Sequence, residues 1–294
     1  MKISQILKDR PTISFEVFPP KNDGSDISSI YSTIDRLASL DPDFISVTYG
    51  AGGSTRIKTV EIAFDIKRRG VEPVAHLTCK TLDKSEALGI CRRLKEGGVE
   101  NILVLRGDDP KDPLAAPVKN DFEHASDLVK FIEENFPGTF CISGARYPEV
   151  HPQAESMRRD LQALKIKADA GAQYLVTQLF YDNSYYYRLV KEARKIGITQ
   201  PILAGIMPAV NPKSLIRTAN MCGASIPYNL STMLQAYYDY PQAMREIGIN
   251  YAASQIIDLV TNGVDGIHIY TMNRPRIAKA IFDSIPTVLK ELRK

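Results

Sequence analysis

The feature of this chain that most limits its fold is a regular alternation between short apolar runs and longer amphipathic stretches. The apolar runs are rich in β-branched residues, and the stretches between them repeat with a helical period. There are eight such runs, at residues 12–18, 44–49, 72–78, 101–107, 139–147, 173–181, 201–208 and 266–271. Strands that alternate with helices form parallel sheets with right-handed crossovers. Eight units therefore predict an α/β fold closed into a (β/α)8 TIM barrel.

One segment departs from the simple alternation. Residues 229–262 are helical in pattern but too long for a single crossover helix, so we expect one or two extra helices before the last strand. The structural rival is an open, doubly wound sheet. The chain has no Gly-x-Gly-x-x-Gly after its first run and no Walker A sequence, which are the usual nucleotide-binding signatures of that fold. We therefore expect residues 1–294 to form a single barrel domain.

Composition excludes several classes of function. With 37 basic and 34 acidic residues, the net charge of +3 is too small to indicate binding to nucleic acid or to anionic lipid. No apolar stretch approaches the roughly 18 residues of a membrane span, and residues 1–11 do not resemble a signal peptide. A cytoplasmic location is the expectation. The four cysteines form no CxxC pair and the four histidines show no metal-ligand spacing, so we expect no metal site.

Polar side chains gather where the predicted strands end. The carboxyl-terminal ends of the strands form the rim at which barrel enzymes build their active sites. Loops are polar in most proteins, but Glu16, His76 and Gln178 are embedded within apolar runs, which loop polarity does not explain. These three residues are therefore candidates for a functional role.

Glu16 is the most informative of them. Strand alternation directs Phe15 and Val17 toward the helices, and Ser14, Glu16 and Phe18 toward the barrel axis. Apolar surroundings disfavour a carboxylate, and a carboxylic acid that keeps its proton can act as a general acid. The alternative is an ion pair inside the barrel, with Arg106 or Arg274 as the partner.

Eight motifs along the chain resemble those of a known family. They are SFEVFPPK, VTYGAGGST, HLTC, RGD, ARYPEVHPQA, TQLFYD, GIMP and YTMNR. In this order and spacing they closely resemble the methylenetetrahydrofolate reductase family, in its bacterial form with the catalytic domain only, from Ser14 to about Ala280. The resemblance implies a TIM barrel with non-covalently bound FAD. It also implies reduction of 5,10-methylenetetrahydrofolate to 5-methyltetrahydrofolate by NADH or NADPH, with ping-pong hydride transfer through FAD.

The resemblance also implies roles for single residues. Glu16 matches the general acid that protonates N10 of the folate and opens its five-membered ring. Asp108 matches the aspartate near the flavin, where a negative charge would stabilise the iminium cation that ring opening produces; a plain turn aspartate is its alternative reading. Gln178 matches the amide that hydrogen-bonds the pterin. Arg274 looks like the cation that meets the glutamate tail of the folate.

The FAD site implied by the resemblance draws on several segments. The diphosphate needs cations such as Lys167, the ribose and ribityl hydroxyls need acceptors such as Asp160, and the flavin ring needs a flat wall such as Tyr147. The full set matched to the family is Thr48, Tyr49, Ala51, His76, Arg106, Gly107, Asp108, Ala125, Tyr147, His151, Ala154, Asp160 and Lys167.

Two other functions stay open at this point. One is a methyltransferase that uses methyltetrahydrofolate on the same fold without a flavin. The other is a flavin subunit of a larger complex, which would receive electrons from a partner protein. In each case the substrates are small molecules, and we expect the chain to assemble with copies of itself.

Overall fold

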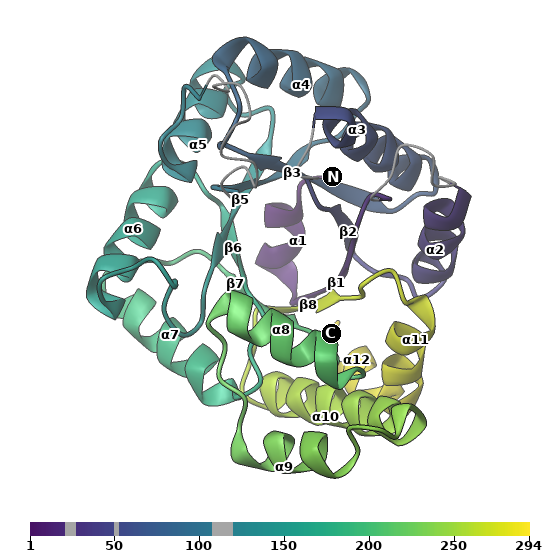
Figure 1. Cartoon of the computed structure of the whole chain (residues 1–294). Helices are drawn as coiled ribbons and strands as arrows, with labels where there is room; N and C mark the ends of the chain where they lie inside the picture. Colours follow the sequence, from purple (N-terminus) through teal and green to yellow (C-terminus); the bar gives the residue numbers. More distant parts are fainter. Residues whose placement is uncertain (21–27, 50–52, 108–119) are drawn as a thin grey trace, which may run out of the picture.

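Eight parallel strands close into a barrel in the order β1 to β8 (Figure 1). The structure is a computed structural model and describes residues 1–20, 28–49, 53–107 and 120–294. The predicted barrel and its eight strands are confirmed. β3 ends at the same residue as its apolar run. The other seven strands end before their runs do, because the last residues of those runs belong to the loops at the rim. The strands are β1 Thr12–Val17, β2 Phe44–Val47, β3 Glu72–Thr78, β4 Asn101–Leu105, β5 Cys141–Arg146, β6 Tyr174–Thr177, β7 Ile202–Ile206 and β8 Gly266–Tyr270.

Helices surround the barrel on its outer face (Figure 1). The helices that follow the strands are α2 Ser28–Ala38, α3 Gly53–Arg68, α4 Lys84–Glu96, α5 Ala125–Asn135, α6 Met157–Asp169, α7 Asn183–Lys195, α8 Pro212–Cys222 and α11 Pro275–Ser284. The predicted extra helices before β8 are also present, as α9 Tyr228–Ala236 and α10 Pro241–Thr261. Two short helices were not predicted, α1 Ile3–Asp9 and α12 Pro286–Leu292. Within the described ranges, no helix combines the length and the apolarity needed to cross a membrane.

Helix starts follow local capping signals. The side chain of Asp83 accepts a hydrogen bond from the Glu86 backbone N–H at the start of α4, and Ser156 does the same for Arg159 at the start of α6. Such caps satisfy backbone donors that the first helical turn leaves without partners. The cap at Ser156 fixes where α6 begins after β5.

The alternation of side chains along the strands builds two apolar layers. Phe15 and Val17 face outward and pack with Ile34 and Leu37 of α2 between the sheet and the helices. Inward-facing residues such as Phe44, Leu103 and Tyr174 fill the lower part of the barrel. A fully buried side chain of this size contributes about 1.5–3 kcal/mol of hydrophobic stabilisation. The lower barrel is therefore a packed core that supports the rim above it.

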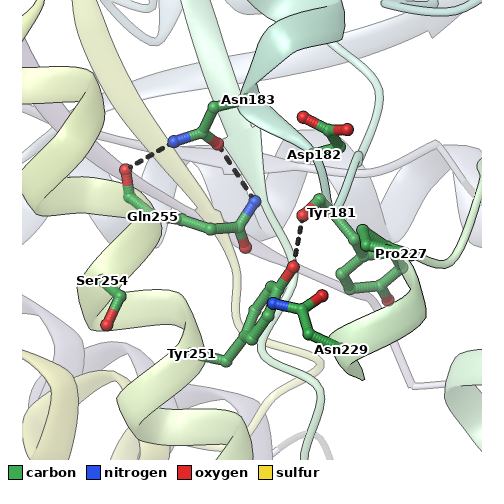
Figure 2. A pocket seen from close by; sticks show the side chains of 8 residues that line it. All are labelled: Tyr181, Asp182, Asn183, Pro227, Asn229, Tyr251, Ser254 and Gln255. Atoms are coloured by element: carbon green, nitrogen blue, oxygen red, sulfur yellow. Dashed lines mark hydrogen bonds between the residues drawn. The ribbon is translucent and has the colours of Figure 1, made fainter. Parts of the chain in front are cut away.

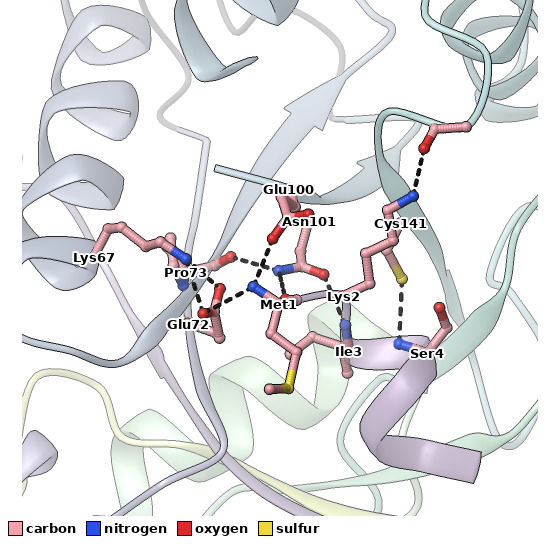
Figure 3. Close-up of polar contacts among 11 residues, drawn as sticks. Met1, Lys2, Ile3, Ser4, Lys67, Glu72, Pro73, Glu100, Asn101 and Cys141 are labelled. Carbon is pink, nitrogen blue, oxygen red and sulfur yellow. Dashed lines mark hydrogen bonds and ion pairs between the residues drawn. The ribbon is translucent and has the colours of Figure 1, made fainter. Parts of the chain in front are cut away.

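Helix α1 covers the amino-terminal end of the barrel (Figure 1). Ile3 is fully buried, and its backbone N–H donates to Asn101 Oδ1 at 2.9 Å. Beside it, Lys67 Nζ contacts Glu72 Oε1 at 2.8 Å, and the Met1 amino nitrogen lies 2.9 Å from the same oxygen (Figure 3). These contacts hold α1 in place as a floor beneath the packed interior.

Candidate active site

Glu16 lies at the upper end of β1 with its side chain inside the barrel, and it is 6% exposed. Its Oε2 atom is 3.5 Å from His76 Nε2 on β3 and 3.7 Å from His268 Nε2 on β8. Among the described residues, these two histidines are the ionisable groups that pair with Glu16, and neither Arg106 nor Arg274 does so. The arginine ion pair that the sequence left open is therefore not the arrangement in the described part of the barrel.

His76 is the first of the two imidazoles beside Glu16. The ring is 5% exposed, and burial lowers the pKa of His76 to about 4, with the nearby Glu16 opposing that shift. The imidazole is therefore neutral near neutral pH. Its Nε2 atom is buried and forms no hydrogen bond with any residue in the described ranges. A buried polar atom without a partner is costly and commonly marks a place that a ligand completes.

His268 is the second imidazole, and the sequence analysis did not single it out. It is fully buried, with Nδ1 2.8 Å from Ser14 Oγ and Nε2 3.4 Å from Ser46 Oγ. Residues 14 and 268 are direct partners in the β1–β8 ladder. The sequence pattern could have identified His268 as a residue that faces the barrel axis. Ile267 and Ile269 pack toward the helices, and side chains alternate along a strand, so the residue between them must face inward.

The loop after β8 is tied to the end of β1. Thr271 Oγ1 donates to the backbone carbonyl of Glu16 at 2.7 Å. The Asn273 side chain both accepts from the Phe18 N–H and donates to the Phe18 carbonyl, each at 2.9 Å. Met272 and Asn273 adopt positive φ angles of 51° and 55° to make this turn. The loop thus fixes the backbone at Glu16 and just after it, and it leaves Arg274 exposed at the start of α11.

A group of charged residues surrounds the end of β5 and the start of α6. Arg146 is 3% exposed and forms an ion pair with Asp160 of α6. Asp160 Oδ2 also accepts from the His151 backbone N–H at 2.8 Å. Nearby, Arg106 donates to the side chain of Gln153 at 2.8 Å. The sequence analysis missed Arg146, although it is the last residue of β5 and lies beside the predicted Tyr147.

Lys167 adds a third cation to this region. Its Nζ donates to the Ala145 carbonyl at 2.8 Å. Burial lowers the pKa of Lys167 to about 8, and the neighbouring Arg146 lowers it further while Asp160 opposes the shift. Arg146 and Lys167 both lie near Asp160, with Arg106 close by, and among the described residues Asp160 is the carboxylate that forms an ion pair within this group. Such an excess of positive charge suits an anionic group such as a diphosphate.

The flat side chains expected near a flavin lie beside this group. The rings of Tyr147 and His151 meet edge to face with centroids 4.6 Å apart. Burial lowers the pKa of His151, with Asp160 opposing the shift. Both residues sit in the loop that connects β5 to α6, so they border the cation group directly.

The remaining residues matched to the family occupy other rim loops. Gly107 has a φ of 81°, and a Cβ atom there would lie 2.9 Å from Thr78 Cβ, so the turn after β4 requires glycine at this position. Thr48 and Tyr49 follow β2, Ala125 begins α5 and Ala154 precedes α6. Ala51 and Asp108 lie outside the described residues.

Gln178 directly follows β6 and is half-buried at the rim. Its Oε1 atom accepts from the Leu179 N–H at 2.9 Å, and its own backbone N–H donates to the Arg146 carbonyl at 2.6 Å. These contacts fix the residue between β5 and β6, with its amide NH2 group as the part available for donation.

A separate cavity of about 390 Å³ lies outside the barrel, between the start of α7 and helices α9 and α10 (Figure 2). Tyr251 donates to the Tyr181 carbonyl at 2.6 Å, and Gln255 Nε2 contacts Asn183 Oδ1 at 3.2 Å. Tyr181 and Asp182, the last residues of the TQLFYD motif, line this cavity, but none of the residues to which the resemblance gives a catalytic, cofactor or substrate role does so. Its contacts tie α10 to the segment that carries Gln178.

No group of three or more His, Cys, Asp or Glu side chains arranged to hold a metal ion occurs within the described ranges.

Comparison of the sequence with known proteins identifies relatives in one family. The sequence profile described as methylenetetrahydrofolate reductase matches residues 2–286 of this chain. The 5,10-methylenetetrahydrofolate reductase of Escherichia coli is 38% identical over 270 residues, covering 92% of this chain and 88% of the relative. The methylenetetrahydrofolate reductase (NADH) 1 of Arabidopsis thaliana is 36% identical over 292 residues, covering 95% of this chain and 49% of the relative. The chain therefore spans about half the length of its plant relatives and most of the length of its bacterial ones.

Comparison with solved structures supports the fold. A protein from Clostridium thermocellum, described as binding two copies of 5-methyl-5,6,7,8-tetrahydrofolic acid, superposes with a TM-score of 0.69 at 16% identity, covering 99% of this chain and 98% of the other. Tryptophan synthase from Mycobacterium tuberculosis superposes more loosely, with a TM-score of 0.52 at 11% identity, covering 99% of this chain and 92% of the other. At these identities the likeness concerns the barrel alone.

Proposed function

Because the chain belongs to the methylenetetrahydrofolate reductase family, we propose that it reduces 5,10-methylenetetrahydrofolate to 5-methyltetrahydrofolate, with NADH or NADPH as the electron donor. The observation that carries this proposal is Glu16, a buried carboxyl group at the inner rim between two buried imidazole nitrogens. Such a group can hold a proton away from water and release it to a bound substrate. Residues 1–294 act as one catalytic domain in this proposal.

We propose FAD as the cofactor, because the residues at the rim fit its parts. Arg106, Arg146 and Lys167 supply the positive charge that a diphosphate needs, and the glycine turn at Gly107 brings the backbone close to it. Buried His76 offers an Nε2 atom without a partner among the described residues. Bound FAD would accept a hydride from the nicotinamide dinucleotide and pass it to the folate in a separate half-reaction.

The protein's own residues have distinct tasks in this reaction. Glu16 gives its proton to N10 of the folate, the bond between N10 and the methylene carbon breaks, and the positive charge is left on the N5 iminium group. Gln178 hydrogen-bonds the pterin and Arg274 meets the glutamate tail. Asp108 is proposed to stabilise the iminium charge, although it lies outside the described residues.

The solved structure from Clostridium thermocellum supports a folate as the ligand class, because that barrel is described as binding a tetrahydrofolate. Cytoplasmic location and assembly with copies of the chain stay predictions from the sequence, and delivery of electrons by a partner protein stays an alternative to NADH or NADPH.

An absorption spectrum tests the proposal directly. The purified protein, reconstituted with excess FAD, is expected to retain about one flavin per chain. Anaerobic NADH or NADPH should bleach the flavin, and methylenetetrahydrofolate should then restore its absorbance. A protein that retains no flavin but transfers the methyl group of methyltetrahydrofolate would contradict the proposal in favour of a methyltransferase. A flavin that folate reoxidises but neither dinucleotide reduces would point to a partner protein as the donor.

A further inference from the structure

A column of buried polar groups extends beneath Glu16 along the inner faces of three adjacent strands. In the strand ladders, Ser14 pairs with His268, and Glu16 pairs with Ser46 on one side and Tyr270 on the other. Ser14, Ser46 and His268 are fully buried. The His268 ring also stacks on Phe44, with centroids 5.8 Å apart. The ring is therefore held from two sides, below the residue that the proposed reaction uses as its acid.

The hydrogen bonds of Ser14 assign the proton on the His268 ring. The Ser14 hydroxyl has one proton, and it donates this proton to the Ile267 carbonyl at 3.2 Å. At its 2.8 Å contact with His268 Nδ1 the hydroxyl oxygen must therefore accept. His268 therefore carries a proton on Nδ1, and in the neutral tautomer with that proton the Nε2 atom is an acceptor. That acceptor lies 3.7 Å from Glu16 Oε2.

We propose that His268 is a neutral positioning residue that favours the protonated form of Glu16: an Nε2 without a proton faces the carboxyl group and places no positive charge beside it. This inference rests on the proposed function, since it concerns the acid of that reaction. Ser14 acts through His268 by fixing the ring tautomer. Toward an Nε2 without a proton the Ser46 hydroxyl can only donate, at 3.4 Å, so Ser46 competes with Glu16 for the same lone pair.

The other groups that face Glu16 agree with this assignment. His76 on β3 is neutral near neutral pH because it is buried. Tyr270 on β8 is held in its neutral phenol form, since burial and the proximity of Glu16 raise its pKa. Among the described residues, therefore, no permanent cation faces the carboxyl group to favour its charged form.

His268→Asn tests the role of Nε2. The asparagine amide can still donate to Ser14 in place of Nδ1–H, but it has no atom in place of Nε2. In the wild type and in the variant, the rate of flavin reoxidation by methylenetetrahydrofolate should decline as the pH rises. The midpoint of this decline should lie at a lower pH in the variant, so that at neutral pH the variant is about tenfold slower than the wild type. Flavin reduction by NADH or NADPH should keep its wild-type rate. An unshifted pH profile, or a shift to higher pH, overturns the inference; the second result would mean that His268 is a cation.

A matched pair of serines separates positioning from packing. Ser46→Ala and Ser143→Ala each remove one fully buried hydroxyl from the inner face of the barrel. Ser143 donates to the Ile102 carbonyl at 3.3 Å and lies outside the column. We expect Ser46→Ala to shift the pH profile of the folate half-reaction in the direction opposite to His268→Asn, because the variant frees the Nε2 lone pair for the carboxyl proton, and Ser143→Ala to leave the profile unchanged. Equal profiles in the two serine variants would contradict the inference even if His268→Asn fails to fold.

Nitrogen NMR of histidine-labelled protein without ligands gives a readout independent of activity. The chain has four histidines, and loss of one set of signals in His268→Asn assigns the resonances of His268. We expect a protonated Nδ1 and a bare Nε2 near neutral pH. A ring protonated on both nitrogens would overturn the tautomer assignment. Failure of the wild type to transfer a hydride to the folate would instead contradict the proposed function. The NMR measurement would still test the protonation of the His268 ring, because it does not depend on activity.

Discussion

At Glu16, the structure separates two explanations of one buried carboxyl group. An ion pair with a barrel arginine would make the residue structural, whereas a place between two buried imidazoles leaves it free of a permanent cation among the described residues and suits the proposed role as an acid. The described contacts of its side-chain carboxyl are with His76 and His268, so the acidic role is the reading that the surroundings support. This distinction leads to a measurable difference between the two half-reactions.

Glu16→Gln should impair only the half-reaction that needs an acid. Glutamine keeps the size of the side chain but cannot release a proton, and lost general-acid catalysis costs about 10²–10⁴ in rate. Stopped-flow measurements should show a normal rate of flavin reduction by NADH or NADPH and a reoxidation by methylenetetrahydrofolate slowed by that factor. Equal losses in both half-reactions, together with a lower melting temperature, would return Glu16 to a structural role.

Gln178→Ala should weaken the folate half-reaction for a different reason. Its backbone is fixed between two strands, so the substitution removes the amide without moving the chain. A lost buried hydrogen bond costs about 1–3 kcal/mol, which corresponds to about a ten- to hundredfold fall in kcat/KM for methylenetetrahydrofolate. Gln242→Ala, at an exposed position in the first turn of α10, is the control and should behave as the wild type. Unchanged folate turnover in Gln178→Ala would disprove the role.

At the scale of elements, the sequence predicted most of what carries the site. Strand alternation placed Glu16 inside the barrel, and the long segment before β8 gave two extra helices. It did not reveal α1, because seven residues are too few for a clear helical period. It also missed His268 and Arg146, whose roles depend on partners distant in the chain: Ser14 for the first and Asp160 for the second. Such contacts are set by the closed barrel and leave little local signal.

Helix α10 depends on one glycine for its close approach to the barrel. A Cβ atom at Gly248 would lie 2.5 Å from the backbone carbon of Ala209, just after β7. Gly248→Ala should therefore lower the free energy of unfolding by about 1–3 kcal/mol, the usual cost of overpacking. Gly89→Ala is the matched control on α4, where nothing lies within 4 Å of the added atom.

The control should have the opposite effect. Alanine is favoured over glycine inside a helix by about 0.5–1 kcal/mol, so Gly89→Ala should stabilise the protein by about that amount. Urea unfolding measures both variants. Equal effects in the two variants would show that helix propensity, and not the contact with Ala209, governs the position of Gly248.

For the molecule as a whole, burial of His76 links stability to pH. The pKa of His76 is about 4 in the folded protein and near 6.5 when the ring is exposed. Below pH 6.5 the unfolded chain therefore binds a proton that the folded protein rejects, and stability falls until the folded group also titrates near pH 4. By about pH 5 this group alone should remove about 2 kcal/mol from the free energy of unfolding.

Urea unfolding near neutral pH and near pH 5 measures this loss. His76→Gln should reduce the difference between the two conditions by about 2 kcal/mol. His124→Gln, which removes an exposed histidine, should leave the difference as it is in the wild type. A pH dependence that survives unchanged in His76→Gln would assign it to other groups.

Helix α1 closes the amino-terminal end of the barrel, so in the described structure access to the interior is from the carboxyl-terminal rim. Ile3, Phe44 and Tyr174 are all fully buried at its lower end, so in the described structure the way to Glu16 leads from the rim. In the proposed reaction, the folate and the proton that restores Glu16 would therefore enter from the same end of the barrel. While a bound ligand fills that end, water would not reach the carboxylate of Glu16. We therefore expect the product to leave before Glu16 is protonated again in each turnover.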